Sequence, residues 1–135
     1  MCAVKIHKIS KFDLAYTYPK QFYYLDDTDT FRIPSYIKKI SKQTFYSSNL
    51  KSLTIPARVS VIEAGAFSYM KYLKTMYFNQ PAEMNVSLPA SGMVYSKDAK
   101  EMTIYTDNEI IKNYNWAGDN ITATIYHLDG TEWEA

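Results

Sequence analysis

The sequence predicts a repeat solenoid that is mainly β, with its strands stacked in parallel, and two observations lead to this prediction. The pattern Ile-Pro-x-x-Ile/Val-x-x-Ile-x-x-x-x-Phe occurs twice, and every position shifts by the same interval, from Ile33 to Ile55 and from Phe45 to Phe67. A second phrase of three apolar positions begins at Leu50 and returns at Leu73. One such unit cannot bury its own apolar face, so units of this length stack and form a continuous core.

Each unit is expected to contain one short strand. Apolar and polar residues alternate in Leu53-Thr54-Ile55, which is typical of a strand whose Thr54 points outward. Pro56 lacks an N–H group and ends this strand, and Pro34 does the same one unit earlier. The predicted structural core collects the inward positions of both units: Ile33, Ile37, Ile40, Phe45, Leu50, Leu53, Ile55, Val59, Ile62, Phe67, Leu73, Met76 and Phe78.

Residues 1–30 are expected to form an N-terminal cap, because the first unit would otherwise expose the edge of its apolar column. Residues 3–14 alternate like one or two strands, and a cluster of aromatic side chains follows. An alternative is that these aromatics dock another subunit. The candidate docking aromatics are Tyr16, Tyr18, Phe22, Tyr23 and Tyr24.

The pattern weakens after the two clear repeats at 31–78. Residues 79–106 are expected to form a third, degenerate repeat with a loop insertion. The strand phrase returns at Met102, and the expected alignment therefore places this methionine opposite Met76 of the preceding unit.

The last part of the chain, 107–135, is expected to close the stack with a short helix and β-strands. Asp107 or Asn108 is the predicted N-cap of the helix. Residues 121–128 alternate and are rich in β-branched side chains, which favours a strand. Asp129-Gly130 is a strong turn signal, and residues 131–135 are expected to return as a short strand.

The run from Ile55 to Phe67 resembles the BspA-like class of leucine-rich repeat, whose unit continues a strand into Ile-Pro, Val-x-x-Ile and Ala-Phe. The resemblance covers residues 31–78 and is specific there. At Arg58 the sequence departs from the commoner leucine-rich repeats, in which an Asn at this position forms a ladder along the stack. It departs from its own class in having no Cys after the Phe. The resemblance implies a non-catalytic adhesion module at the cell surface or outside the cell.

Composition and charge limit the classes of partner. The chain has 135 residues, enough for a single domain at 1–135 with a modest core. Its formal net charge of +1 gives no electrostatic reason to expect nucleic acid or an anionic membrane. No stretch has the length of a signal peptide or membrane span, so membrane insertion is not expected. Cys2 has no second cysteine to pair with, and the redox compartment stays open.

The sequence predicts no enzyme, no metal site and no cofactor. His7 and His127 lie far apart in strand-like contexts without further ligands at metal-binding spacing. The acidic cluster at 26–29 has no Gly to shape a calcium loop, so a turn is the better interpretation. Glu132 and Glu134 flank Trp133 like the solvated face of a strand. An active site assembled from distant residues is the minor alternative.

The outward positions of the strand phrases are the candidate binding face, because stacked units bring them into columns on the side that repeat proteins commonly use. They mix Arg and Tyr with small hydroxyl side chains, which suits contact with a protein or a glycan. The candidate residues are Thr30, Arg32, Ser52, Thr54, Thr75, Tyr77, Glu101 and Thr103. An ordinary solvated strand face fits the same residues.

Two functions are therefore expected. The first is a binding module of unidentified protein or glycan partner. The second is a structural subunit or decoration protein of a virion or other surface assembly, in which the chain forms a homo-oligomer or a larger array. Two clear repeats fall short of the three that a stable solenoid needs, so caps or neighbouring subunits must complete the stack.

Overall fold

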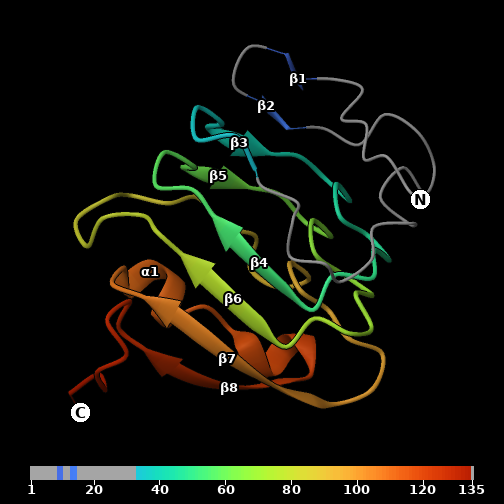
Figure 1. The fold of residues 1–135 in the computed structure, drawn as a ribbon. Coiled ribbons are helices and arrows are strands. Elements are labelled where there is room, and N and C mark those ends of the chain that lie inside the picture. The colour runs from blue at the N-terminus through green and yellow to red at the C-terminus, as the bar shows by residue number, and fades with distance from the viewer. Residues whose placement is uncertain (1–8, 11–12, 15–32, 135) are drawn as a thin grey trace.

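The computed structural model describes residues 9–10, 13–14 and 33–134, and shows a mainly β solenoid of about four turns with little helix. The strands at 52–55, 75–78, 100–106 and 121–126 lie side by side, and their arrows point in the same direction (Figure 1). This is the fold class that the repeated pattern predicts. The expected docking aromatics, the acidic cluster, Cys2, His7, Thr30 and Arg32 lie outside the described residues.

One face of the solenoid is a four-stranded parallel sheet in the order β4-β6-β7-β8. Its strands are β4 (Ser52–Ile55), β6 (Thr75–Phe78), β7 (Lys100–Thr106) and β8 (Ile121–Tyr126). We call its solvent-facing side the strand face. In β4 and β6 buried and less buried residues alternate, as the sequence predicts for a strand with one apolar side.

The return side of the coils forms a second sheet from short strands, in the order β1-β2-β3-β5. These are β1 (Ile9–Ser10), β2 (Asp13–Leu14), β3 (Lys39–Ile40) and β5 (Val61–Ile62). The first pair is antiparallel and the others are parallel. Strands are therefore confirmed at 9–10 and 13–14, and the rest of the expected 3–14 lies outside the described residues. Through β2 these strands continue the stack of the two clear repeats.

The core runs between the two sheets. All thirteen predicted core residues are buried, and most are fully enclosed. The rings of Phe45 and Phe67 stack with their centroids 5.9 Å apart, which shows the equivalent positions of two coils packed on each other. Trp116 and Tyr114 close the C-terminal end of the core, and the ring of Trp116 lies edge-on to that of Phe78, with the centroids 6.2 Å apart.

Residues 79–100, expected to be a loosened coil with an insertion, follow the coil before them closely. Ser87 forms a parallel bridge with Val61, and Gly65 N and Phe67 N donate to the carbonyl oxygens of Gly92 and Met93. Gly92 has a φ of +84°, close to the +75° of Gly65, so each turn uses a left-handed residue at the same place. A cluster of buried apolar residues replaces the consensus: Val86, Met93 and Val94.

The alignment of Met102 with Met76 is wrong. In the structure Ile104 lies opposite Met76, and Thr103 lies opposite Thr75. Strand β7 has seven residues where β6 has four, and it begins earlier. A slip of two residues keeps the alternation of inward and outward side chains, so the pattern alone could not distinguish the two registers.

The C-terminal elements are α1 (Glu109–Lys112) and a 3-10 helix, η1 (Trp116–Asp119). Asn108 is the N-cap of α1, because its side chain accepts hydrogen bonds from two backbone N–H groups of the first turn. Strand β8 ends at Tyr126, two residues before the predicted end, because a turn over 127–131 follows it. The expected return strand is reduced to one antiparallel bridge between Tyr126 and Glu132.

Candidate functional site: the strand face

The strand face carries two rows of side chains, fixed by the register of its four parallel strands. The hydroxyl row runs across the sheet and consists of Ser52, Thr75, Thr103 and Thr124. The aromatic row lies two residues further along each strand and consists of Thr54, Tyr77, Tyr105 and Tyr126.

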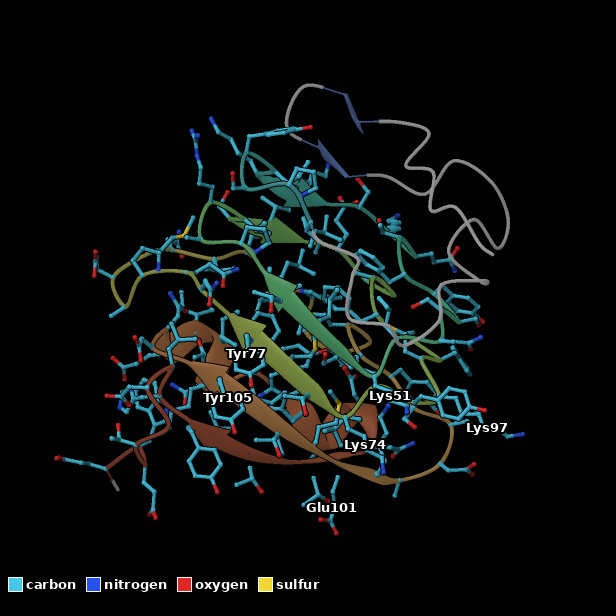
Figure 2. All side chains as sticks on the ribbon, viewed as in Figure 1. Lys51, Lys74, Tyr77, Lys97, Glu101 and Tyr105 are labelled. Carbon is cyan, nitrogen blue, oxygen red and sulfur yellow. The ribbon has the colours of Figure 1, made fainter. Side chains whose placement is uncertain are left out.

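The three tyrosines of the aromatic row form a continuous stack, which we call the tyrosine ladder. The rings of Tyr77 and Tyr105 are 4.6 Å apart and inclined by 8°, and those of Tyr105 and Tyr126 are 5.7 Å apart and inclined by 27°. Figure 2 shows Tyr77 and Tyr105 side by side on neighbouring strands. Because parallel strands are about 4.8 Å apart, identical side chains in register stack without distortion. The ladder therefore presents ring edges and hydroxyl groups to solvent.

The true register changes part of the predicted face. Ser52, Thr54, Thr75 and Tyr77 lie in the two rows as expected. Thr103 belongs to the hydroxyl row. The wrong alignment places it opposite Tyr77, a position that Tyr105 occupies in the structure. Glu101 lies beyond the hydroxyl row, opposite Thr122.

The sequence interpretation missed Tyr105, Tyr126 and Thr124. A signal for them was present, because Tyr105 and Tyr126 each follow an apolar residue in a strand-like run, as Tyr77 does.

A second tyrosine cluster lies on the turns at the side of the coils. The ring of Tyr69 lies 5.1 Å from that of Tyr46 and 5.5 Å from that of Tyr95, at inclinations of 49° and 62°. Tyr69 has a φ of +57°, a left-handed conformation at a turn position. Unlike the stacked rings of the tyrosine ladder, these rings are tilted against one another. They lie on one side of the molecule, outside the strand face.

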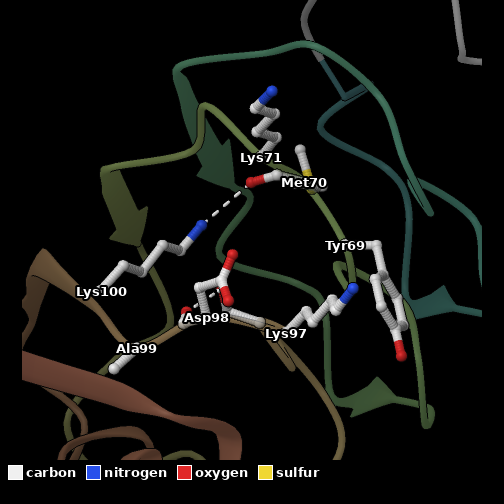
Figure 3. Close-up of a pocket in the computed structure, with 8 residues that line it drawn as sticks. Tyr69, Met70, Lys71, Lys97, Asp98, Ala99 and Lys100 are labelled. Carbon is white, nitrogen blue, oxygen red and sulfur yellow. Dashed lines mark hydrogen bonds between the residues drawn. The ribbon is translucent and has the colours of Figure 1, made fainter.

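A basic hollow of about 300 Å³ lies between the Tyr69 turn and the start of β7 (Figure 3). Its charged lining residues are Lys71, Lys97, Asp98 and Lys100. The ammonium group of Lys100 donates to the Met70 carbonyl oxygen at 2.9 Å. Burial, together with repulsion by Lys74, lowers the pKa of Lys100 to about 8.

A buried polar cluster holds the C-terminal coils together beneath the surface. The carboxylate of Asp119, fully buried, accepts from Gly92 N at 2.6 Å and from Val94 N at 2.9 Å. The Asp119 carboxylate also accepts from the hydroxyl of Tyr114 at 2.6 Å. The Tyr114 hydroxyl oxygen in turn accepts from Met93 N. Burial and the bond to Asp119 raise the pKa of Tyr114 above its ordinary value. Every group is hydrogen-bonded, so the cluster has a structural role.

The described residues contain no group of three or more His, Cys, Asp and Glu that could hold a metal ion. His127 pairs with Asp107 at 2.9 Å and stacks on Trp133 at 4.1 Å, which joins the turn after β8 to the end of β7. Within the part of the chain that the structure describes, no helix has the length and apolar character to cross a membrane.

Comparison with known families agrees with this geometry. The family model for the BspA type leucine rich repeat region matches residues 5–125 with six copies. The chain therefore belongs to the BspA-type leucine-rich-repeat family. The match begins within the expected N-terminal cap and reaches into β8, well beyond the two clear repeats. No curated protein and no solved structure matches the chain.

Proposed function

We propose that this protein is a non-catalytic binding module that contacts a protein or glycan partner at a cell surface through its strand face. Members of its family are commonly binding or adhesion modules and are generally not enzymes. The observation that carries the proposal is the tyrosine ladder, Tyr77, Tyr105 and Tyr126, which continues over three successive strands beside a row of hydroxyl groups.

The ladder is suited to binding because tyrosine supplies a large contact area at a low cost in side-chain entropy. Stacking of each ring on its neighbours restricts the rings further, so less freedom is lost when a partner binds. Tyr77 is 37% exposed and Thr54 and Thr124 are exposed, so the face is open to solvent.

A protein partner fits this geometry better than a glycan. A sugar ring packs best on an uncovered aromatic face, whereas both faces of Tyr105 are covered by the neighbouring tyrosines. The tyrosine ladder exposes ring edges and phenol groups to solvent, and these combine apolar contact with hydrogen bonding. Tyrosine is enriched at protein interfaces for this reason.

The test compares the purified wild-type chain with Tyr105→Ser on a defined array of immobilised proteins and glycans. The matched control is Tyr72→Ser, because Tyr72 is 46% exposed and lies outside the strand face. We expect at least one array component to retain the wild type and the control but not Tyr105→Ser. Retention that is equal for all three chains would contradict a role for the strand face.

The second candidate is a subunit of a larger assembly, and the outer edge of β8 favours it. Among the described residues, β8 pairs with β7 on one side and, on the other, makes only the bridge from Tyr126 to Glu132. A parallel edge with unpaired backbone groups can accept another strand. Light scattering over a wide concentration range decides: a discrete oligomer supports the assembly, whereas a monomer at every concentration supports the binding module.

A further inference from the structure

The basic hollow adjoins the strand face at the end where β6 and β7 begin, and a second, more open hollow continues it along those strands. The second hollow adds Lys74 and Glu101 to the charged lining. Together the two hollows are bordered by four lysines, Lys71, Lys74, Lys97 and Lys100, against two carboxylates. The net charge of the whole chain is only +1, so this positive charge is local.

The lysines are not neutralised within the part of the chain that the structure describes. Among the described residues, none of the four forms an ion pair, whereas Lys39 pairs with Glu63. The side chains of Lys71, Lys74 and Lys97 are exposed and can turn toward a bound group. An unneutralised cluster of like charge draws anions and steers their approach.

Lys100 is the fixed member of the cluster. Its ammonium group is held against the Met70 carbonyl oxygen while losing part of its hydration, and the charge of Lys74 repels it. An anion in the hollow would replace the lost hydration and offset this repulsion.

We propose that the two hollows bind the carboxylate side chains of an acidic polypeptide segment, which lies along the strand face of the binding module proposed above. This inference rests on that proposed function and adds the chemistry of the partner.

Two observations favour carboxylates on a polypeptide over phosphate or sulfate groups. The lining contains lysines and no arginine, whereas the forked guanidinium is the group that best matches phosphate-like oxygens. The surface that continues from the hollow is the hydroxyl row and the tyrosine ladder, which has the composition of a protein interface.

The spacing also fits one extended segment. Tyr77 follows Lys74 by three residues along β6, which at about 3.3 Å per residue is about 10 Å. Because side chains alternate in direction along an extended chain, an extended partner reaches both places with an acidic residue and an apolar residue two or four positions apart.

The test measures fluorescence anisotropy of a labelled peptide of ten glutamates with the full chain at several salt concentrations. The double variant Lys97→Gln/Lys100→Gln removes two charges from the hollow. The control Lys38→Gln/Lys42→Gln removes the same charge from exposed lysines outside it. We expect the wild type and control to bind alike, with affinity falling as salt rises, and the hollow variant to bind at least tenfold more weakly.

Three results would overturn the inference: no binding of the peptide at low salt, an equal loss in both double variants, or tighter binding of a sulfated oligosaccharide in the same hollow. The array comparison with Tyr105→Ser is scored separately. Loss of array binding in Tyr105→Ser together with an unaffected hollow variant would leave the proposed function standing and reject the acidic partner.

Discussion

The ring of Tyr77 lies parallel to that of Tyr105, with the centroids 4.6 Å apart and the planes inclined by 8°, although the two residues belong to different coils. The distance is close to the spacing of neighbouring strands, so the contact is a direct product of the register. A solenoid converts a repeated outward position into a row of touching side chains. Here the repeated residue is tyrosine in three coils, and the row becomes a continuous stack of rings.

The first prediction concerns the surface itself. Tyr77→Ala should leave the chain folded, with a loss of about 0.5–1.5 kcal/mol in the free energy of unfolding from the lost ring pair. Urea denaturation followed by circular dichroism measures this, and Tyr72→Ala serves as the exposed control. A chain that is unfolded with Tyr77→Ala would show that the ring supports the core and does not belong to a free face.

The second prediction concerns the core. Phe67→Ala removes a fully buried ring that stacks on Phe45, and should lower the free energy of unfolding by about 3–5 kcal/mol. The same denaturation experiment measures it. A loss below about 1 kcal/mol would mean that the two coils do not pack on each other through this position.

The third prediction concerns Asp119, which joins the third coil to the last one. Asp119→Ala leaves the N–H groups of Gly92 and Val94 and the Tyr114 hydroxyl without this acceptor. Hydrogen bonds to a charged group contribute about 1.5–3 kcal/mol each, so the loss should be about 3 kcal/mol or more. The exposed carboxylate of Asp98 provides the control, and Asp98→Ala should change stability by less than about 0.5 kcal/mol.

The fourth prediction follows from the lowered pKa of Lys100. Its pKa is about 8 in the folded chain and 10.5 in its unperturbed state, so between these values the unfolded chain binds more protons and stability rises with pH. The neighbouring charges are Lys71, Lys74, Lys97 and Asp98.

Stability of the wild type relative to Lys100→Gln should therefore improve between pH 8 and pH 10. The expected gain is about 1 kcal/mol, reduced from the full shift because the side chain is only half-buried. Taking the difference from the variant removes the contribution of Tyr114, whose raised pKa acts in both chains. A flat difference over this range would mean that the Lys100 ammonium is fully hydrated.

The strength of the two clear repeats explains how much of the fold could be predicted. Ile55 and Phe67 repeat Ile33 and Phe45 at one spacing, and the burial of these positions follows from stacking. The third coil could be predicted only as a degenerate repeat, because its turn keeps the backbone geometry but not the consensus side chains. Gly92 preserves the left-handed turn, while Met93 takes a buried place next to it.

The residues of the strand face could be predicted only where the register of the strands was predicted correctly. A slip of two residues preserves inward and outward alternation, so Thr103 was assigned to the wrong row and Tyr105 was missed. The basic hollow could not be predicted at all, because Lys71 and Lys97 belong to turns of different coils. Their proximity depends on the path of the chain in three dimensions.

The most direct test of the central claim is the dissociation constant of the protein identified on the array, measured by calorimetry with the wild type, Tyr105→Ser and Tyr72→Ser. If the tyrosine ladder is the binding surface, Tyr105→Ser should weaken binding at least tenfold, which corresponds to about 1.4 kcal/mol, and Tyr72→Ser should leave it unchanged. Equal affinities for Tyr105→Ser and the wild type would contradict the claim.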